Sequence, residues 1–152
     1  MVTEKYRYWI MLSKWCEVSE SVSDNYLLGG DWTMIPYFCG NADFCSHPTE
    51  RAFDKAVANV RKHFLIVGVL EDYVRFLKLS EILLPVFFRG AVKMYSIKEK
   101  ALKHHSATGY KEKMDPATRS YVQDTHAMQL EIKFYKFIRK RFNRQCYQFK
   151  VK

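Results

Sequence analysis

The sequence predicts an α/β fold in which one strand of a parallel sheet is buried between helices. The first observation is a short, continuous, apolar and β-favouring run from His63 to Val69, which is typical of a strand covered on both faces. The second is that the segments on either side of this run repeat their apolar residues at helical spacing. The third is a long helical pattern from Ala117 to Phe142. Helix, buried strand and helix in succession are typical of parallel sheets.

The chain before the predicted strand divides into a loop, a cysteine-closed segment and a helix. Ser19 to Thr33 contains turn-favouring residues, including a Gly-Gly pair, and predicts an irregular loop. The run from Met34 to Phe38 then leads into the segment between Cys39 and Cys45. Ser46 to His63 predicts a helix, with residues that suit a helix start followed by apolar residues at helical spacing. Those residues are Pro48, Thr49 and Glu50, then Phe53, Ala56, Val57 and Val60.

Leu70 to Leu84 returns to helical spacing, and Pro85 ends the pattern. Ligands of parallel sheets bind beyond the carboxyl ends of the strands, which here is the turn that contains Glu71 and Asp72. Both residues are therefore candidates for polar contacts to a ligand such as a ribose or an adenine. The alternative is that they are simply favourable acidic residues in the first turn of a helix.

The segment from Tyr95 to Pro116 has mixed charge and little periodicity, which predicts a long basic loop. Long loops without regular structure are often functional. From Ala117 to Phe142 the apolar residues follow alternating steps of three and four, which predicts one long helix with a core-facing stripe. The stripe residues are Tyr121, Thr125, Met128, Ile132, Tyr135, Ile138 and Phe142.

The charge of the chain favours polyanionic partners. Its 152 residues include 25 Lys and Arg against 16 Asp and Glu, a formal charge of +9. From Lys133 to the end there are eight basic residues and no acidic one, which indicates either a polyanion-facing surface or a solvated helix face. No stretch approaches the roughly 18 apolar residues that span a bilayer, and the N-terminus lacks a signal-peptide pattern. We therefore expect no membrane anchor or secretory address in the chain as given.

The four cysteines, at positions 16, 39, 45 and 146, favour a small disulfide loop over a metal site. The residues between Cys39 and Cys45 are short and turn-prone, so the two ends can meet, although free thiols remain the alternative. A disulfide would imply an oxidising compartment. A zinc knuckle would need closer spacing and a second ligand pair, and His104-His105 has no carboxylate or thiol cluster nearby, so we predict no metal. Phosphate-binding glycine fingerprints are absent.

Several blocks of the sequence, in order, resemble the glycosaminoglycan 2-O-sulfotransferases of the heparan sulfate and uronyl type. The first is Ile35-Pro36-Tyr37-Phe38-Cys39-Gly40, closed by Cys45. The later ones are Ala52–Ala56 with Asn59, Phe64–Glu71, Leu84–Ala91, and Glu131 with Phe134–Phe137. The likeness covers roughly Trp32 to Phe142, so we divide the chain into a poorly matched segment, 1–31, and the C-terminal portion of a sulfotransferase domain, 32–152.

The resemblance implies the C-terminal part of a P-loop-like sulfotransferase fold. It implies transfer of a sulfuryl group from 3'-phosphoadenosine 5'-phosphosulfate to the 2-hydroxyl of uronic acid residues in heparan sulfate or a related glycosaminoglycan. The implied cofactor contacts are Asp72, Tyr95, Ser96, Ile97, Lys98, Lys100 and Lys111. The implied substrate contacts are Lys103, His104, His105 and Ser106, where Ser106 stands in place of a substrate-contacting arginine of the heparan sulfate enzyme.

In the family, the phosphosulfate loop and the catalytic histidine lie upstream of the part represented here. We therefore predict no catalytic residue in this chain, which would be an inactive fragment when alone, and a Golgi-lumen location by resemblance. The competing hypothesis is a non-catalytic protein that binds sulfated glycosaminoglycan, with nucleic acid the less favoured polyanion. The sequence does not determine whether the protein is a homo-oligomer.

Overall fold

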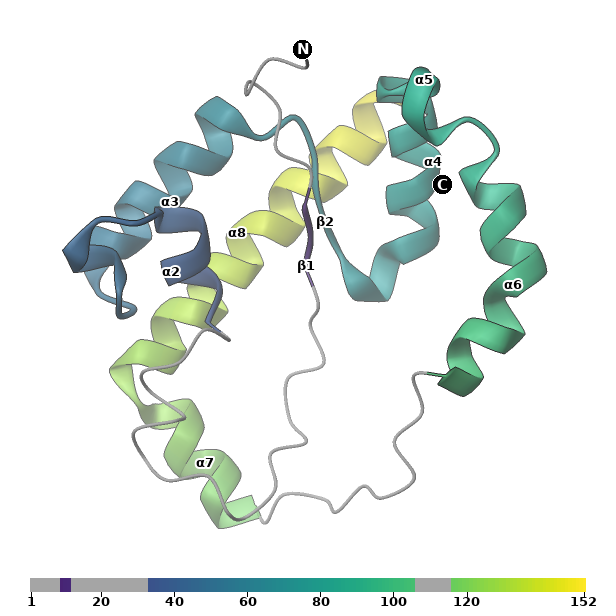
Figure 1. The fold of residues 1–152 in the computed structure, drawn as a ribbon. Coiled ribbons are helices and arrows are strands. Elements are labelled where there is room, and N and C mark those ends of the chain that lie inside the picture. The colour runs from purple at the N-terminus through teal and green to yellow at the C-terminus, as the bar shows by residue number, and fades with distance from the viewer. Residues whose placement is uncertain (1–8, 12–32, 106–115) are drawn as a thin grey trace.

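A computed structural model describes residues 9–11, 33–105 and 116–152 of the chain. At its centre, β1 (Trp9–Met11) pairs in parallel with β2 (Val67–Val69), and Ile10 lies opposite Gly68. Helices surround this pair (Figure 1). In chain order they are α2 (Met34–Cys39), the 3-10 turn η1 (Asp43–Cys45), α3 (Glu50–His63), the 3-10 turn η2 (Leu70–Asp72), α4 (Tyr73–Leu83), α5 (Pro85–Phe88), α6 (Ala91–His105), α7 (Pro116–Asp124) and α8 (His126–Gln148).

The predicted buried strand is confirmed only at Val67–Val69, because His63 belongs to α3, and the helices on either side of it are confirmed. All three residues of β2 are buried, α3 precedes it and α4 follows it. The helix α8 packs against β2 and crosses behind the strands in Figure 1. The chain is nevertheless mostly helical, and its P-loop-like character stays a prediction. The expected loop before Thr33 and the boundary between 1–31 and 32–152 lie outside the described residues.

The helix predicted from Ser46 begins later, at Glu50. The Thr49 hydroxyl accepts a hydrogen bond from the Ala52 backbone N–H at 3.2 Å, so Thr49 is the N-cap and Pro48 precedes the helix. The segment from Met34, expected only to lead into the cysteine loop, forms the short helix α2. Leu84 ends α4 as predicted, but Pro85 also begins the single turn α5.

The prediction of a loop from Tyr95 to Pro116 is wrong for residues 95–105, which belong to α6. The Glu81 carboxylate accepts a hydrogen bond from the Val92 backbone N–H at 3.1 Å, which satisfies one of the free donors at the start of this helix. The apolar residues of α6 do not all face the core, since Met94 and Ile97 are exposed. Their spacing in the sequence therefore gives only a weak helical pattern. The lysine, alanine, leucine and glutamate content of α6 favours a helix by intrinsic propensity, and that signal outweighs the missing periodicity.

The single helix predicted from Ala117 to Phe142 is two helices, α7 and α8, and α8 continues to Gln148. Thr125, expected on the apolar stripe, is the N-cap of α8, and its hydroxyl accepts from the Met128 backbone N–H at 3.3 Å. Tyr121 is 69% exposed rather than packed. The buried face of α8 consists of Met128, Leu130, Glu131, Phe134, Ile138, Phe142 and Cys146.

Phenylalanine rings join α2, α3 and α8 into the main core. The Phe38 ring lies 5.4 Å from the Phe134 ring and 5.1 Å from the Phe64 ring, and Phe53 meets Phe134 edge-on at 6.2 Å. Tilted and edge-on ring pairs stabilise a core beyond the burial of their area. This cluster therefore fixes how the helices lie around β2.

The connection from α3 into β2 is held by polar groups of α8. The Arg141 guanidinium donates to the Phe64 carbonyl at 2.7 Å, and the Gln145 amide donates to the Leu65 carbonyl at 2.8 Å. Partial burial lowers the pKa of Arg141, which still remains charged at neutral pH. These bonds satisfy carbonyls that no helix or strand pairs, and they set the place where β2 begins.

The carboxyl group of Glu131 is buried and caps the N-terminus of α2. Its two oxygens accept hydrogen bonds from the Met34 N–H at 3.0 Å and the Ile35 N–H at 2.9 Å. The side chain of Thr33, at the N-cap position, makes no capping bond. Desolvation raises the pKa of Glu131 to about 7, although the two backbone donors act in the opposite direction.

The predicted disulfide is confirmed, because Cys39 and Cys45 are bonded, with their Cα atoms 5.5 Å apart. Both are buried against the core. The Asn59 amide donates to the carbonyls of Phe38 and Cys39 at 2.9 and 3.0 Å, which fastens the closed loop to α3. In the described part of the chain, no helix has the length and apolar character that crossing a membrane requires.

We expect stability to fall as pH rises through the range set by Glu131. The folded pKa of about 7 exceeds the ordinary glutamate value of 4.5, so the folded state binds more protons than the unfolded state between these two pH values. The free energy of unfolding should therefore decrease between about pH 4.5 and 7, by on the order of 2–3 kcal/mol. Urea denaturation across this range measures the slope.

The Glu131→Gln variant is the matched control for this pH effect, because it removes the titrating group and keeps the side-chain shape. Its amide nitrogen meets one of the two backbone donors, so we expect a loss of about 1–3 kcal/mol at pH 5. Its stability should no longer fall between pH 4.5 and 7. An unchanged slope in this variant would assign the pH dependence to another group.

Reduction of the Cys39–Cys45 bond should lower the free energy of unfolding by about 2 kcal/mol, because the closed loop is short. Denaturation with and without dithiothreitol measures the difference. The double variant Cys39→Ala, Cys45→Ala should not respond to the reductant. Equal stability of the wild-type chain under both conditions would mean that the bond does not stabilise the folded protein.

Candidate functional site

The site lies at the carboxyl end of β2, where the chain turns into α4. Gly68 is needed here, because a Cβ atom at this position would lie 2.4 Å from the Phe76 ring. The absence of a side chain lets α4 pack directly on the strand. The turn η2 therefore presents Glu71 and Asp72 close to the sheet, as the sequence predicts.

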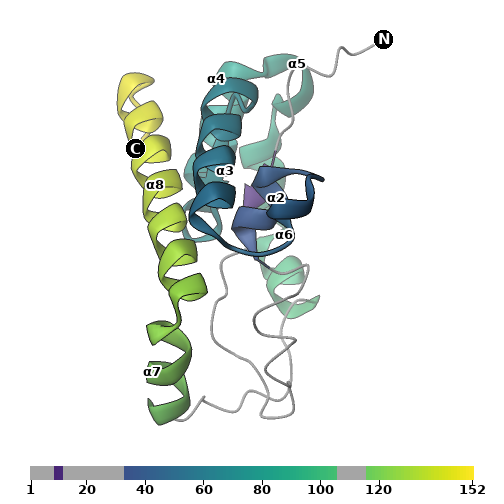
Figure 2. The same cartoon turned by 90° about the vertical axis from the view of Figure 1, so that its left-hand side faces the viewer.

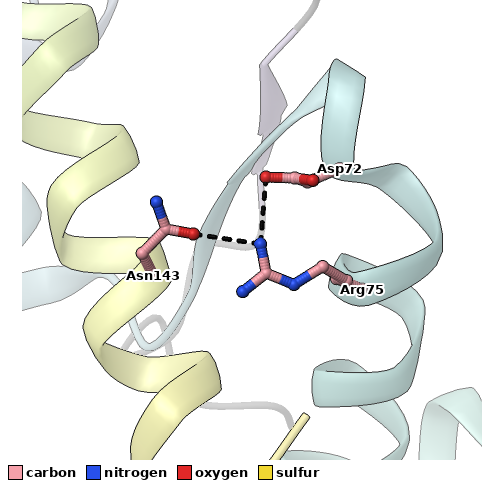
Figure 3. A network of polar contacts seen from close by, with 3 residues as sticks. All are labelled: Asp72, Arg75 and Asn143. Atoms are coloured by element: carbon pink, nitrogen blue, oxygen red, sulfur yellow. Dashed lines mark hydrogen bonds and ion pairs between the residues drawn. The ribbon is translucent and has the colours of Figure 1, made fainter. Parts of the chain in front are cut away.

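Asp72 belongs to a polar network that joins α4 to α8. The Arg75 Nη1 atom donates to the Asp72 carboxylate at 3.2 Å and to the Asn143 side-chain oxygen at 3.0 Å. Figure 3 shows Arg75 between the other two side chains. The Arg75 guanidinium also lies 5.6 Å from the centre of the Phe142 ring. About a quarter of the Asp72 side chain, 27%, remains exposed, so its carboxylate is oriented by Arg75 and open to solvent.

Glu71 lies beside a second residue of α8, Tyr135, whose pKa its charge affects. Burial raises the pKa of Tyr135, and the negative charge of Glu71 raises it further, while Arg139 acts in the opposite direction. The phenol therefore stays protonated at neutral pH and keeps its donor proton.

The helix α6 reaches this end of the strand through two tyrosines. The Tyr95 ring, half-buried on α6, meets the Tyr73 ring edge-on at 4.9 Å, and Tyr73 directly follows Asp72. Tyr73 in turn stacks on Phe76 beneath Gly68. Two of the predicted cofactor residues thus adjoin Tyr73, Asp72 along the chain and Tyr95 through its ring.

The other predicted residues of α6 are not brought into this network by any described contact. Ser96, Ile97 and Lys98 are exposed, and the Ser96 hydroxyl donates to the Val92 carbonyl of its own helix at 2.9 Å. The backbone at Lys100, Lys103, His104 and His105 is helical rather than loop, and the side chains of these four lie outside the described part of the structure. Lys111 and Ser106 lie outside the described residues.

Sequence reasoning missed three residues near this strand end, which are Arg75, Tyr135 and Asn143. The ion pair of Asp72 with Arg75, three residues apart at a helix start, is a spacing that the sequence could have shown. Tyr135 was placed on the apolar stripe, although it is half-buried and polar in its contacts. Asn143 offered no local signal, because only the packing of α8 against α4 brings it to Arg75.

The arrangement can bind but shows no reactive centre. The exposed part of Asp72 can accept hydrogen bonds from hydroxyl or amino groups of a ligand. Tyr73, the next residue in the chain, forms a ring pair with Tyr95. Within the described residues, no three His, Cys, Asp or Glu side chains gather as a metal site would require. Burial raises the pKa of the free thiol of Cys146, which is inside the core and unsuited to nucleophilic attack.

Comparison with known proteins identifies relatives over most of the chain. It is 31% identical over 140 residues to uronyl 2-sulfotransferase of Mus musculus, covering 86% of this chain and 32% of the relative. It is 34% identical over 112 residues to heparan sulfate 2-O-sulfotransferase 1 of Xenopus laevis and of Homo sapiens, covering 73% of this chain and 31% of each relative. No family model matches.

The chain spans about a third of the length of the curated relatives it matches. The matched region is the C-terminal portion of those proteins, as the ordered sequence blocks predict. By homology, the chain therefore belongs to the family of the uronyl and heparan sulfate 2-O-sulfotransferases and corresponds to their C-terminal portion.

Proposed function

We propose that this chain contributes to transfer of a sulfuryl group from 3'-phosphoadenosine 5'-phosphosulfate to the 2-hydroxyl of uronic acid residues in heparan sulfate or a related glycosaminoglycan. The observation that carries the proposal is the position of Asp72. It lies at the carboxyl end of a parallel strand, in a chain homologous to 2-O-sulfotransferases. Strand ends of this kind are where α/β proteins bind nucleotides.

In the proposed reaction, a base removes the proton of the sugar hydroxyl, whose oxygen then attacks the sulfur in line. The bond from sulfur to the bridging phosphate oxygen breaks, and adenosine 3',5'-bisphosphate leaves with the electron pair. We assign this chain a binding role rather than the base. Asp72 would accept a hydrogen bond from the ribose or the adenine, and Tyr95 would flank the nucleotide. Lys111 would lie near a phosphate, and residues 103–106 would contact the polysaccharide.

The proposal extends to the fold and the compartment. We infer that β1 and β2 belong to the sheet of a P-loop-like sulfotransferase fold, whose phosphosulfate loop and catalytic histidine come from sequence upstream of this region. The chain by itself would then be inactive. A location in the Golgi lumen is supported by the Cys39–Cys45 disulfide, because such bonds form in oxidising compartments.

Calorimetric titration of the folded chain with adenosine 3',5'-bisphosphate tests the proposed nucleotide site. We expect saturable binding that is weakened about tenfold in Asp72→Asn, a difference of about 1.4 kcal/mol. The substitution keeps an oxygen that can accept from Arg75, so the orientation of the side chain is retained while its charge is lost.

Asp54→Asn is the matched control, since it removes an exposed carboxylate of α3 away from the strand end and should leave the affinity unchanged. Circular dichroism checks that each variant is folded. Absence of saturable binding by the wild-type chain would contradict a nucleotide site on this part of the fold. Equal affinities of wild type and Asp72→Asn would remove Asp72 from it.

A further inference from the structure

The exposed side of α8 carries a row of basic residues. Lys133, Lys136, Lys140 and Arg144 follow each other at steps of three, four and four residues. At 100° and 1.5 Å per residue, they occupy an arc of about 80° and extend over about 16 Å. We call these four residues the α8 basic stripe. All four are exposed.

The packing of α8 turns the stripe outward. Phe134, Ile138 and Phe142, on the opposite side of the helix, have no exposed surface. Figure 2 shows α8 along the left-hand edge of the molecule, with α3 and α4 to one side of it only. The stripe is thus held on a rigid element whose orientation is set by the core.

The stripe is largely unneutralised. Only Lys133 has an ion pair among the described residues, with Glu50 at 3.7 Å, and it also lies 4.5 Å from the centre of the Phe53 ring. Arg61 of α3 adds a further positive charge beside the stripe, since its guanidinium lies 5.5 Å from the centre of the Phe137 ring. Arg141 behaves differently, because it donates to carbonyls of the chain itself. The positive charge of Lys136, Lys140 and Arg144 therefore serves no described contact within the fold.

We propose that the α8 basic stripe is a binding surface for a linear sulfated polysaccharide, separate from the strand-end site. The class of ligand rests on the proposed function, in which such a polysaccharide is the acceptor. A row of exposed cations at regular spacing matches the row of sulfate and carboxylate groups on a linear chain. The surface would hold the polysaccharide at a distance from the reacting sugar and raise its local concentration.

Two observations favour a polysaccharide over a nucleic acid. Single-stranded nucleic acids bind to exposed aromatic rings interleaved with basic residues. The aromatic residues between Lys133 and Arg144 are Phe134, Tyr135, Phe137 and Phe142, and all are buried or half-buried. One exposed ring, Tyr147, follows the stripe, so basic residues and exposed rings do not alternate along it. The Cys39–Cys45 disulfide also indicates an oxidising compartment, where sulfated glycosaminoglycans are the more available polyanions.

The test compares two variants that lose the same charge. The stripe variant carries Lys136→Ala, Lys140→Ala and Arg144→Ala, and the control variant carries Lys55→Ala, Lys62→Ala and Lys93→Ala on α3 and α6. All six positions are exposed and helical, so alanine should preserve the fold. Affinity for a size-defined heparan sulfate oligosaccharide is measured for the folded chains at two NaCl concentrations.

We expect the stripe variant to bind at least about tenfold more weakly, and the control variant to change less than about threefold. The dependence of log K on log salt concentration should also become shallower in the stripe variant, by roughly one per lost contact. A third variant, Lys136→Arg with Lys140→Arg and Arg144→Lys, should restore binding because it keeps the charge.

Equal losses in the stripe and control variants, or no heparan sulfate binding by the wild-type chain, would overturn the proposal. Tighter binding of a single-stranded oligonucleotide through the same residues would also overturn it. Titration with adenosine 3',5'-bisphosphate tests the proposed nucleotide site independently, so failure of the stripe proposal can be distinguished from failure of the proposed function. If the chain binds the nucleotide but the stripe variant loses no more heparan sulfate affinity than the control, the strand-end site is retained and the stripe is rejected. If the chain does not bind the nucleotide but only the stripe variant loses heparan sulfate affinity, the stripe is retained and the strand-end site is rejected.

Discussion

The fold depends on one buried carboxyl group, that of Glu131. Its oxygens receive two backbone donors at the start of α2, which is nearly a hundred residues away in sequence, and thereby tie that helix to α8. Burial of a carboxyl is costly unless its oxygens are hydrogen bonded. The interaction is therefore specific in position, since a shift of either helix would leave a buried polar group unpaired. The disulfide loop that follows α2 and the ring cluster around Phe134 are placed by the same contact.

The helix α8 organises the rest of the molecule because its sides contact different parts of the chain. One side holds Glu131 and the apolar core, and a second donates from Arg141 and Gln145 to the connection before β2. A third carries Tyr135 and Asn143 to the turn after β2. Both ends of the buried strand are thus positioned by one helix. The fourth side is the basic stripe, in which only Lys133 contacts another described element.

Features that depend on local sequence were easier to predict than features that depend on tertiary contacts. The buried strand was predictable because its apolar run is uninterrupted, and the cysteine pair because its loop is short enough to close. The helix α6 was mistaken for a loop because its apolar side packs only partly, on Tyr73 and α4, so that no strong periodicity arises. The break between α7 and α8 was missed because Thr125 fits the stripe spacing as well as an N-cap. In the candidate site, Asp72 followed from strand topology, whereas its partner Asn143 is 71 residues away.

The sequence by itself determined the family, the order of helix, strand and helix, the acidic residues at the strand end and the positive charge of the C-terminal segment. These properties depend on local composition, on spacing or on ordered motifs, all of which are written along the chain. Only the tertiary structure decided that Arg75 orients Asp72, that Tyr135 lies beside Glu71, and that Arg141 bonds to the chain itself while Lys136, Lys140 and Arg144 are exposed. The physical reason is that these outcomes depend on contacts between residues far apart in sequence. Helix packing determines which charged side chains form hydrogen bonds within the protein and which stay exposed to solvent.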